Sequence, residues 1–295
     1  TIDLITDENI ASIMYSFISD ERIFIWIAAL LYLVAFVFGF YSLSQSKRYP
    51  RIILLSLVIV GFLFQTLGLY ERGLKTSSCP LGNPFEIIQF ITWTAILLYL
   101  VIGPAFRMSL LGFFSAGLAA GLGILSLLIP EWDHAYETGP YGINPWIETH
   151  ASMALFSYGV FATLALTSAM YLVQNYGLKQ KRSKGMVSFL PSILQLDQMN
   201  KRLLFMGVVV FTFAISVGMV KWVDDFSQIQ NAKLIFALAL WLAYVLILIL
   251  RLLNYLIGIK FSWTCVVLFT ASLLTLWPID ASRSVVNEQP SEQGP

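Results

Sequence analysis

The chain contains two histidines, and His150 offers the clearest chemistry. It stands in the run Trp146-Ile-Glu-Thr-His-Ala-Ser-Met-Ala-Leu-Phe-Ser-Tyr158, where His150 and Tyr158 fall on one stripe at helical spacing. An imidazole above an apolar and aromatic stripe is suited to ligate a haem iron. The alternative interpretation is an interfacial histidine that only caps the helix or reaches toward water. His134 lies earlier, in the segment 130–146; it is a candidate second ligand, or else a solvated loop histidine.

A second group of polar residues opens an earlier helix of the chain. In Cys79-Pro-Leu-Gly-Asn-Pro-Phe-Glu86, Asn83 fits an N-cap, Pro84 the first helical position and Glu86 the third, as in a capping box. That structural role explains the pattern by itself. The functional hypothesis adds that Asn83 and Glu86 project toward the same pocket as His150.

Other kinds of chemistry have no support in the sequence. There is no nucleophile elbow, zinc-protease motif, phosphate-binding loop or dinucleotide fingerprint. Cys79 and Cys265 fall toward opposite ends of the predicted bundle, so we expect no disulfide between them. A net charge of +1 indicates no nucleic-acid partner.

The elements that must position these residues are membrane-spanning helices. The chain is 58% hydrophobic and 12% charged, about half the charged fraction of a soluble domain. Its apolar stretches are each long enough to cross a ~30 Å hydrocarbon core, and only helices satisfy their own backbone there. The sequence therefore predicts an all-α polytopic bundle of about eight transmembrane helices, at 23–44, 52–70, 85–105, 109–129, 147–175, 203–220, 232–250 and 261–279.

Basic residues set the predicted orientation. Most of the 18 lysines and arginines fall in the segments 45–51, 105–108, 179–202 and 251–260. Such segments face the inner side, which places both termini on the outer side. We expect an outer segment 1–22, a transmembrane domain 23–279 and a polar tail 280–295. Within the domain, the inner segment 176–202 is expected to include an interfacial helix on the inner leaflet.

The middle of every predicted span lacks Asp, Glu, Lys and Arg. Transporters driven by ions or protons usually keep an ionisable group at that depth, so this absence argues against transport of a small solute. Gln65 and Gln89 are the deepest polar residues of their helices. We expect them to form hydrogen bonds between helices.

Three segments, in this order, resemble the cytochrome c assembly protein family, the membrane haem-handling proteins of CcsA and HemX type. The segment Pro80–Glu86 is similar to that family's P-L-S-N-x-Y/F-E, and His150–Gly159 to its H-x-S-x-x-x-x-S-Y helix. Leu190–Leu203 is similar to its L-P-S-L-x-x-L-x-x-x-N-x-R-L stretch. The chain departs from haem-exporting members in lacking the tryptophan-rich W-G-x-x-W-x-W-D segment. It has Ala232 and Lys233 where HemX-type relatives place a histidine.

The resemblance implies a function and a site. It implies a multi-pass protein of the bacterial plasma membrane that binds haem b in an outer pocket, with His150 as an axial ligand of the iron. Trp93, Tyr158 and Trp222 would flank the macrocycle, and His134 would substitute as the second ligand. The protein would present haem to other membrane proteins of a cytochrome maturation or respiratory-type complex, without itself being an enzyme. The alternative is a haem-free scaffold subunit of such a complex, with a small-solute transporter as the remaining candidate.

Overall fold

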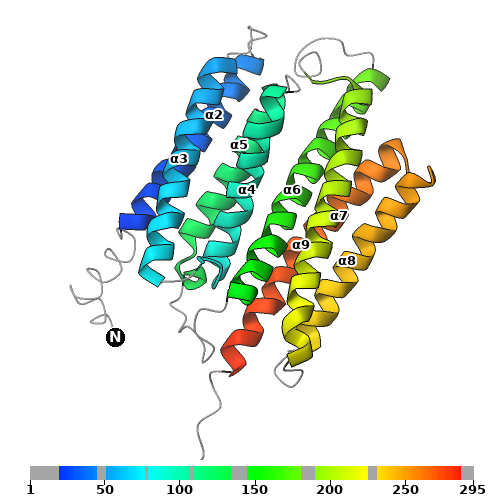
Figure 1. The fold of residues 1–295 in the computed structure, drawn as a ribbon. Helices are drawn as coiled ribbons and strands as arrows, with labels where there is room; N and C mark the ends of the chain where they lie inside the picture. Colours follow the sequence, from blue (N-terminus) through cyan, green and yellow to red (C-terminus); the bar gives the residue numbers. More distant parts are fainter. Residues whose placement is uncertain are drawn as a thin grey trace, which may run out of the picture.

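The computed structural model describes residues 20–44, 51–76, 79–105, 109–133, 145–180, 190–224 and 231–286. Its elements are eight α-helices and one short 3-10 turn, and no strand occurs in these ranges (Figure 1). They are α2 (Asp20–Ser44), α3 (Arg51–Thr76), α4 (Pro84–Ala105), α5 (Ser109–Leu128), η1 (Pro130–Trp132), α6 (Pro145–Lys179), α7 (Ile193–Asp224), α8 (Asn231–Leu252) and α9 (Gly258–Val286).

The helices match the membrane-spanning prediction. Seven of the described helices, α2 to α8, are long and apolar enough to cross a membrane. In α9 the apolar stretch among the described side chains is the shorter Gly258–Leu273. The prediction of an all-α bundle of about eight helices is confirmed, while the position of the termini stays a prediction. We use "outer end" for the end where α2, α4 and α6 begin, and "inner end" for the opposite one.

The segment before the sixth span differs from expectation. Leu194 and Met199 belong to the first turns of α7, which runs without a break from Ile193 to Asp224. No separate interfacial helix therefore occurs in residues 193–202. Ser192 and Gln195 form a reciprocal cap, in which Gln195 N donates to Ser192 Oγ at 3.3 Å and Ser192 N donates to Gln195 Oε1 at 3.2 Å. This cap starts the long helix well before its apolar part.

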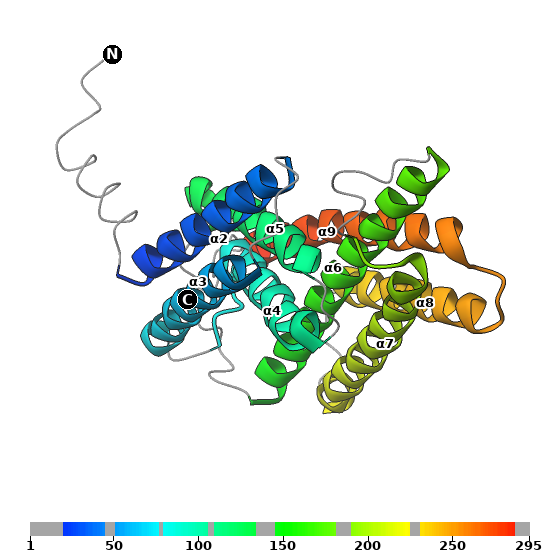
Figure 2. The same ribbon diagram turned by 90° about the horizontal axis from the view of Figure 1, so that it is seen from above.

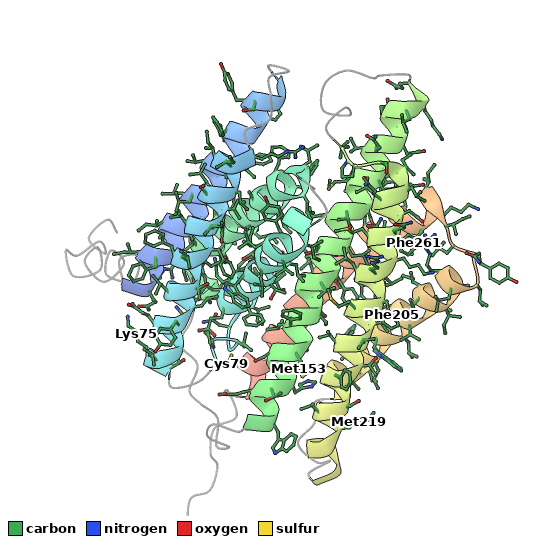
Figure 3. All side chains as sticks on the ribbon, turned by 45° about the horizontal axis from the view of Figure 1, so that its top comes forward. Lys75, Cys79, Met153, Phe205, Met219 and Phe261 are labelled. Atoms are coloured by element: carbon green, nitrogen blue, oxygen red, sulfur yellow. The ribbon has the colours of Figure 1, made fainter. Side chains whose placement is uncertain are left out.

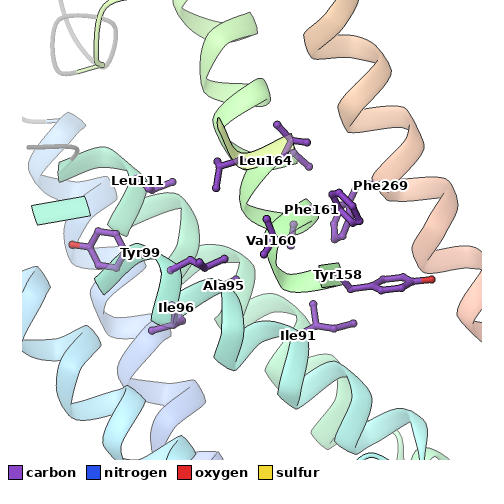
Figure 4. Packing of buried hydrophobic residues seen from close by; sticks show 14 of the residues in the cluster. Ile91, Ala95, Ile96, Tyr99, Leu111, Tyr158, Val160, Phe161, Leu164 and Phe269 are labelled. Atoms are coloured by element: carbon purple, nitrogen blue, oxygen red, sulfur yellow. The ribbon is translucent and has the colours of Figure 1, made fainter. Parts of the chain in front are cut away.

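The helices form two groups. Helices α2 to α5 pack together, and α6 packs with α7 and α9, with α8 against α7 and α9 (Figures 1 and 2). The contact between α4 and α6 joins the two groups. It depends on Gly159, because a Cβ there would lie 2.4 Å from the Thr94 side chain and 3.2 Å from the Ile91 carbonyl oxygen. Figure 4 shows Ile91 and Ala95 of α4 beside this part of α6.

A chain of hydrogen bonds crosses all four helices of the first group. Tyr32 of α2 donates to Gln65 Oε1 of α3 at 3.0 Å, and Gln65 Nε2 donates to Gln89 Oε1 of α4 at 2.9 Å. Gln65 Nε2 also reaches Thr92 Oγ1 at 3.0 Å, and Gln89 Nε2 donates to Ser126 Oγ of α5 at 2.9 Å. The expected interhelical role of Gln65 and Gln89 is thus confirmed.

We expect Gln65→Met to lower the free energy of unfolding by about 1–2 kcal/mol, because it leaves the buried Gln89 amide and Thr92 hydroxyl short of a donor. Thermal unfolding in detergent micelles measures the effect. Gln180→Met, at an exposed glutamine on the inner end of α6, is the control and should leave the melting temperature unchanged. Equal melting curves for the two variants would contradict the structural role of Gln65.

Candidate functional site

His150 lies on α6 at the outer end and faces α7. Its Nδ1 atom is 2.6 Å from the carbonyl oxygen of Ala214. The two helices approach closely here because residue 218 is glycine. A Cβ at Gly218 would stand 2.7 Å from His150 Nδ1, so any larger residue would displace the imidazole or separate the helices.

The hydrogen bond to Ala214 selects one form of the imidazole. A carbonyl oxygen only accepts, so Nδ1 must carry the proton and donate it. In the neutral ring, Nε2 then holds the lone pair. This arrangement is typical of metal-ligating histidines, in which one ring nitrogen donates to a backbone carbonyl and the other binds the metal.

Tyr158 lies on the same side of α6, about two turns further into the bundle. It is buried, and its ring packs edge-on against Phe211 of α7, with centroids 6.4 Å apart. Below it, Phe161 stacks on Tyr244 of α8 with centroids at 3.6 Å and planes 3° apart. In Figure 4, Tyr158 and Phe161 both point toward α9. An aromatic column therefore lines the second helix group beneath His150.

Asn83 forms the predicted helix cap. Its Oδ1 accepts from Glu86 N at 2.9 Å, and Glu86 Oε2 accepts from Gly82 N at 2.6 Å. Both residues are completely buried. The cap at the start of α4 is thus confirmed.

The side chains of Asn83 and Glu86 belong to a buried cluster of charges at the outer end. Glu86 Oε1 pairs with Arg72 Nε at 2.5 Å, and Arg72 also pairs with Asp133. Asp133 pairs in turn with Arg22, and accepts from Asn83 Nδ2 at 3.4 Å. Two arginines thus face two carboxylates from α2, α3, α4 and the residue after η1, and the formal charges cancel.

Phe85 packs against both arginines of this cluster. The guanidinium carbons of Arg22 and Arg72 stand 5.2 Å and 5.1 Å from its ring centroid. Arg22 also donates to the carbonyl oxygen of Leu127 at the end of α5, at 3.1 Å. The stacked ring and the carbonyl compensate part of the cost of burying the two cations.

Several predicted site residues have their polar partners in or beside this charge cluster and do not contact His150. Arg72 and Lys75 are cations at the outer end, of the kind that could meet haem propionates, but Arg72 pairs with Glu86 and Asp133, and Lys75 pairs with Glu21. Asn83 and Glu86 contact the charge cluster and not His150. No sequence pattern indicates Arg22 and Asp133 as partners, because both lie in short polar stretches next to apolar spans.

Trp93 lies on the side of α4 that faces α3. Its Nε1 donates to Thr66 Oγ1 at 2.9 Å, and its ring stacks on Phe62 at 5.5 Å. The structure therefore does not bring Trp93 and His150 together. His134 and the side chain of Trp222 lie outside the described residues.

A loop contact links the two groups beside His150. Cys79 N donates to Glu148 Oε1 at 3.3 Å, and Cys79 Sγ lies 3.5 Å from Ser152 Oγ, both residues on α6 (Figure 3). Burial raises the pKa of the Cys79 thiol, so it is protonated at neutral pH. Cys79 and Cys265 are both free cysteines, as expected.

The third motif, Leu190–Leu203, buries an amide at the inner end. Asn200 is fully buried on α7, and within the described residues neither Nδ2 nor Oδ1 has a hydrogen-bond partner. The apolar members of the motif, such as Leu196 and Leu203, form core. The motif therefore combines a helix start, a packing face and one polar side chain inside the bundle.

The fold and the outer-end residues define a polytopic helical membrane protein whose two helix groups meet beside a fixed histidine. The model of the family described as "Cytochrome C assembly protein" matches residues 81–282, more than half of the chain, and the chain belongs to this family.

Individual relatives agree with this family. The chain is 28% identical over 221 residues to "Protein HemX" of Brevibacillus brevis, which covers 72% of this chain and 80% of that protein. It is 22% identical over 230 residues to "Protein HemX" of Bacillus subtilis (strain 168), which covers 77% and 83%. It is 27% identical over 254 residues to "Cytochrome c biogenesis protein CcsA" of Synechococcus sp. (strain CC9902), which covers 76% and 82%.

We expect Arg72→Met to destabilise the protein by about 3–5 kcal/mol, because the buried Glu86 and Asp133 carboxylates each lose a cation. Lys75→Met is the matched control. The Lys75 side chain is 53% exposed, and its pair with Glu21 should contribute no more than about 1 kcal/mol. Unfolding in detergent micelles measures both, and similar losses for the two variants would contradict a central role of Arg72.

Proposed function

We propose that this protein acts in cytochrome c biogenesis by binding haem b at the outer end and presenting it to partner proteins. Membership of the cytochrome c assembly family supports a role in this process within a membrane. Relatives named CcsA carry cytochrome c biogenesis in their names. The haem site, the outward orientation and the location in a bacterial plasma membrane are parts of the proposal.

The observation that carries the haem proposal is the hydrogen bond from His150 Nδ1 to the Ala214 carbonyl oxygen. It fixes the ring and leaves Nε2 with the lone pair that an iron ligand requires. His150 would bind the haem iron. The haem is cargo in this proposal, so its iron takes part in no chemistry here beyond that coordination bond. Gly218 provides the close approach on which the hydrogen bond depends.

The remaining residues of the proposed site have different roles. Tyr158 supplies an aromatic wall deeper on α6, His134 is the proposed second axial ligand, and Trp222 a proposed neighbour of the macrocycle. Asn83, Glu86 and Trp93 act on the site only through the packing of α4, since their polar atoms contact other partners. The proposed pocket is therefore built on α6 and α7.

Partners complete the proposal. A haem held through histidine can pass to a partner protein whose ligands bind the iron more tightly. We propose that other membrane proteins of a cytochrome maturation or respiratory-type complex are the receivers. In this proposal the chain forms and breaks only its bonds to the haem iron, so it works as a carrier.

A haem-free scaffold subunit is the second candidate. The observation that favours it is the pairing of Arg72 and Lys75 with carboxylates of the chain itself. Those cations are then occupied where haem propionates would need them. Such a protein would use the same helices only to hold its partners in the membrane.

The haem proposal predicts a Soret band in the purified protein that depends on His150. We expect His150→Ala to abolish or shift the band, because no other described side chain offers the iron a fixed imidazole. A pyridine haemochrome assay gives the haem content. Absence of haem from the wild-type protein, purified from cells with ample haem, would favour the scaffold.

Two glycine variants test whether the orientation of His150 matters. Gly218→Ala places a methyl group against the imidazole, and we expect it to shift the Soret band and lower haem content several-fold. Gly121→Ala is the control, because a Cβ there meets nothing within 4 Å. Equal haem content in these two variants, both folded as judged by their melting temperatures, would contradict the proposed part of Gly218.

A further inference from the structure

Polar side chains join α7 and α8 in the middle of the bundle and again at the inner end, where Arg251 of α8 pairs with Asp197 of α7. Trp241 Nε1 of α8 donates to Thr212 Oγ1 of α7 at 3.0 Å, which holds the two helices together in the middle of the bundle. Because the helices are antiparallel, about two turns toward the inner end bring Phe205 level with Leu248. About one further turn brings Lys201 level with Leu252.

A groove opens in this inner part of the contact. It has a volume of about 370 Å³ and is lined by Gln198, Lys201, Arg202, Phe205, Leu248 and Leu252. Phe205, labelled in Figure 3, is 57% exposed and Leu252 is 54% exposed, so the groove is accessible from the surface. Its volume falls in the range of about 300–1,000 Å³ that is usual for small-molecule sites.

The groove is amphipathic along the membrane normal. Its apolar walls, Phe205 and Leu248, lie toward the middle of the bundle, and its cations, Lys201 and Arg202, lie toward the inner end. From Thr212 to Lys201 the helix rises roughly 16 Å at about 1.5 Å per residue. One leaflet of a ~30 Å hydrocarbon core has nearly the same thickness, so the cations reach the depth of the lipid headgroups when Thr212 is at mid-membrane.

We propose that this groove binds one anionic phospholipid of the inner leaflet. The phosphate lies against Lys201 and Arg202, with the Gln198 amide as a further hydrogen-bond donor. An acyl chain runs along Phe205, Leu248 and Leu252 and stops where Trp241 and Thr212 close the contact. Basic pockets between transmembrane helices recognise anionic headgroups in this way. The site is independent of the haem proposal, because it lies at the other end of the bundle.

Native mass spectrometry of the purified full chain tests the proposal with phosphatidylglycerol and with phosphatidylcholine of the same acyl chains. We expect preferential binding of phosphatidylglycerol, weakened about fivefold by Lys201→Gln or Arg202→Gln and about 30-fold by both, at about 1 kcal/mol per basic residue. Lys260→Gln is the control, since this exposed lysine is also at the inner end but does not line the groove. It should leave the preference unchanged.

A second variant tests the apolar part of the site. Leu248→Trp fills the groove without changing any charge, and we expect it to weaken phosphatidylglycerol binding at least as much as the loss of one cation. Equal binding of the two lipids by the wild-type protein would overturn the proposal. An effect of Lys260→Gln as large as that of Lys201→Gln, or full binding by Leu248→Trp, would overturn it as well.

Discussion

Polar side chains inside a lipid-embedded bundle must find partners within the protein, and this constraint shapes the first helix group. The hydrogen bonds from Tyr32 through Gln65 and Gln89 to Ser126 join its four helices at one level. The charges of Arg22, Arg72, Glu86 and Asp133 join α2, α3 and α4 with the residue after η1 at the outer end. Each contact requires the others, because moving one helix would leave several buried groups unsatisfied.

The second helix group is held mainly by packing. Glycines at 159, 207 and 218 each receive a side chain of a neighbouring helix, and aromatic rings fill the space beneath His150. Where α7 meets α8, the Trp241–Thr212 hydrogen bond and, toward the inner end, the Arg251–Asp197 ion pair join the two helices at separate levels. The first group is joined instead by one continuous chain of hydrogen bonds.

Hydropathy and charge predicted the number and type of the helices, because the thickness of the membrane fixes the length of an apolar span. The residue types at positions 83, 84 and 86 predicted the Asn83 cap, because the signal for a helix cap is local in sequence. Prediction was weaker where the outcome depends on tertiary partners. Trp93 and Glu86 have the right types for a haem pocket, yet the rotation of α4 turns one toward Thr66 and the other toward Arg72. The prediction of an interfacial helix was wrong for residues 193–202, which belong to α7, because an amphipathic stretch and the exposed first turns of a long helix have the same pattern.

The family motifs thus perform different physical tasks in the two groups. Pro80–Glu86 places the Glu86 carboxylate against Arg72 of α3, so that motif is explained by the stability of the outer end. The motif around His150 is not explained in this way. Gly218 makes room for the His150 ring, and the bond from Nδ1 to the Ala214 carbonyl oxygen orients the imidazole so that Nε2 keeps its lone pair. A ligand to a metal needs one nitrogen oriented in this way, and on this ground we propose the haem site on α6 and α7.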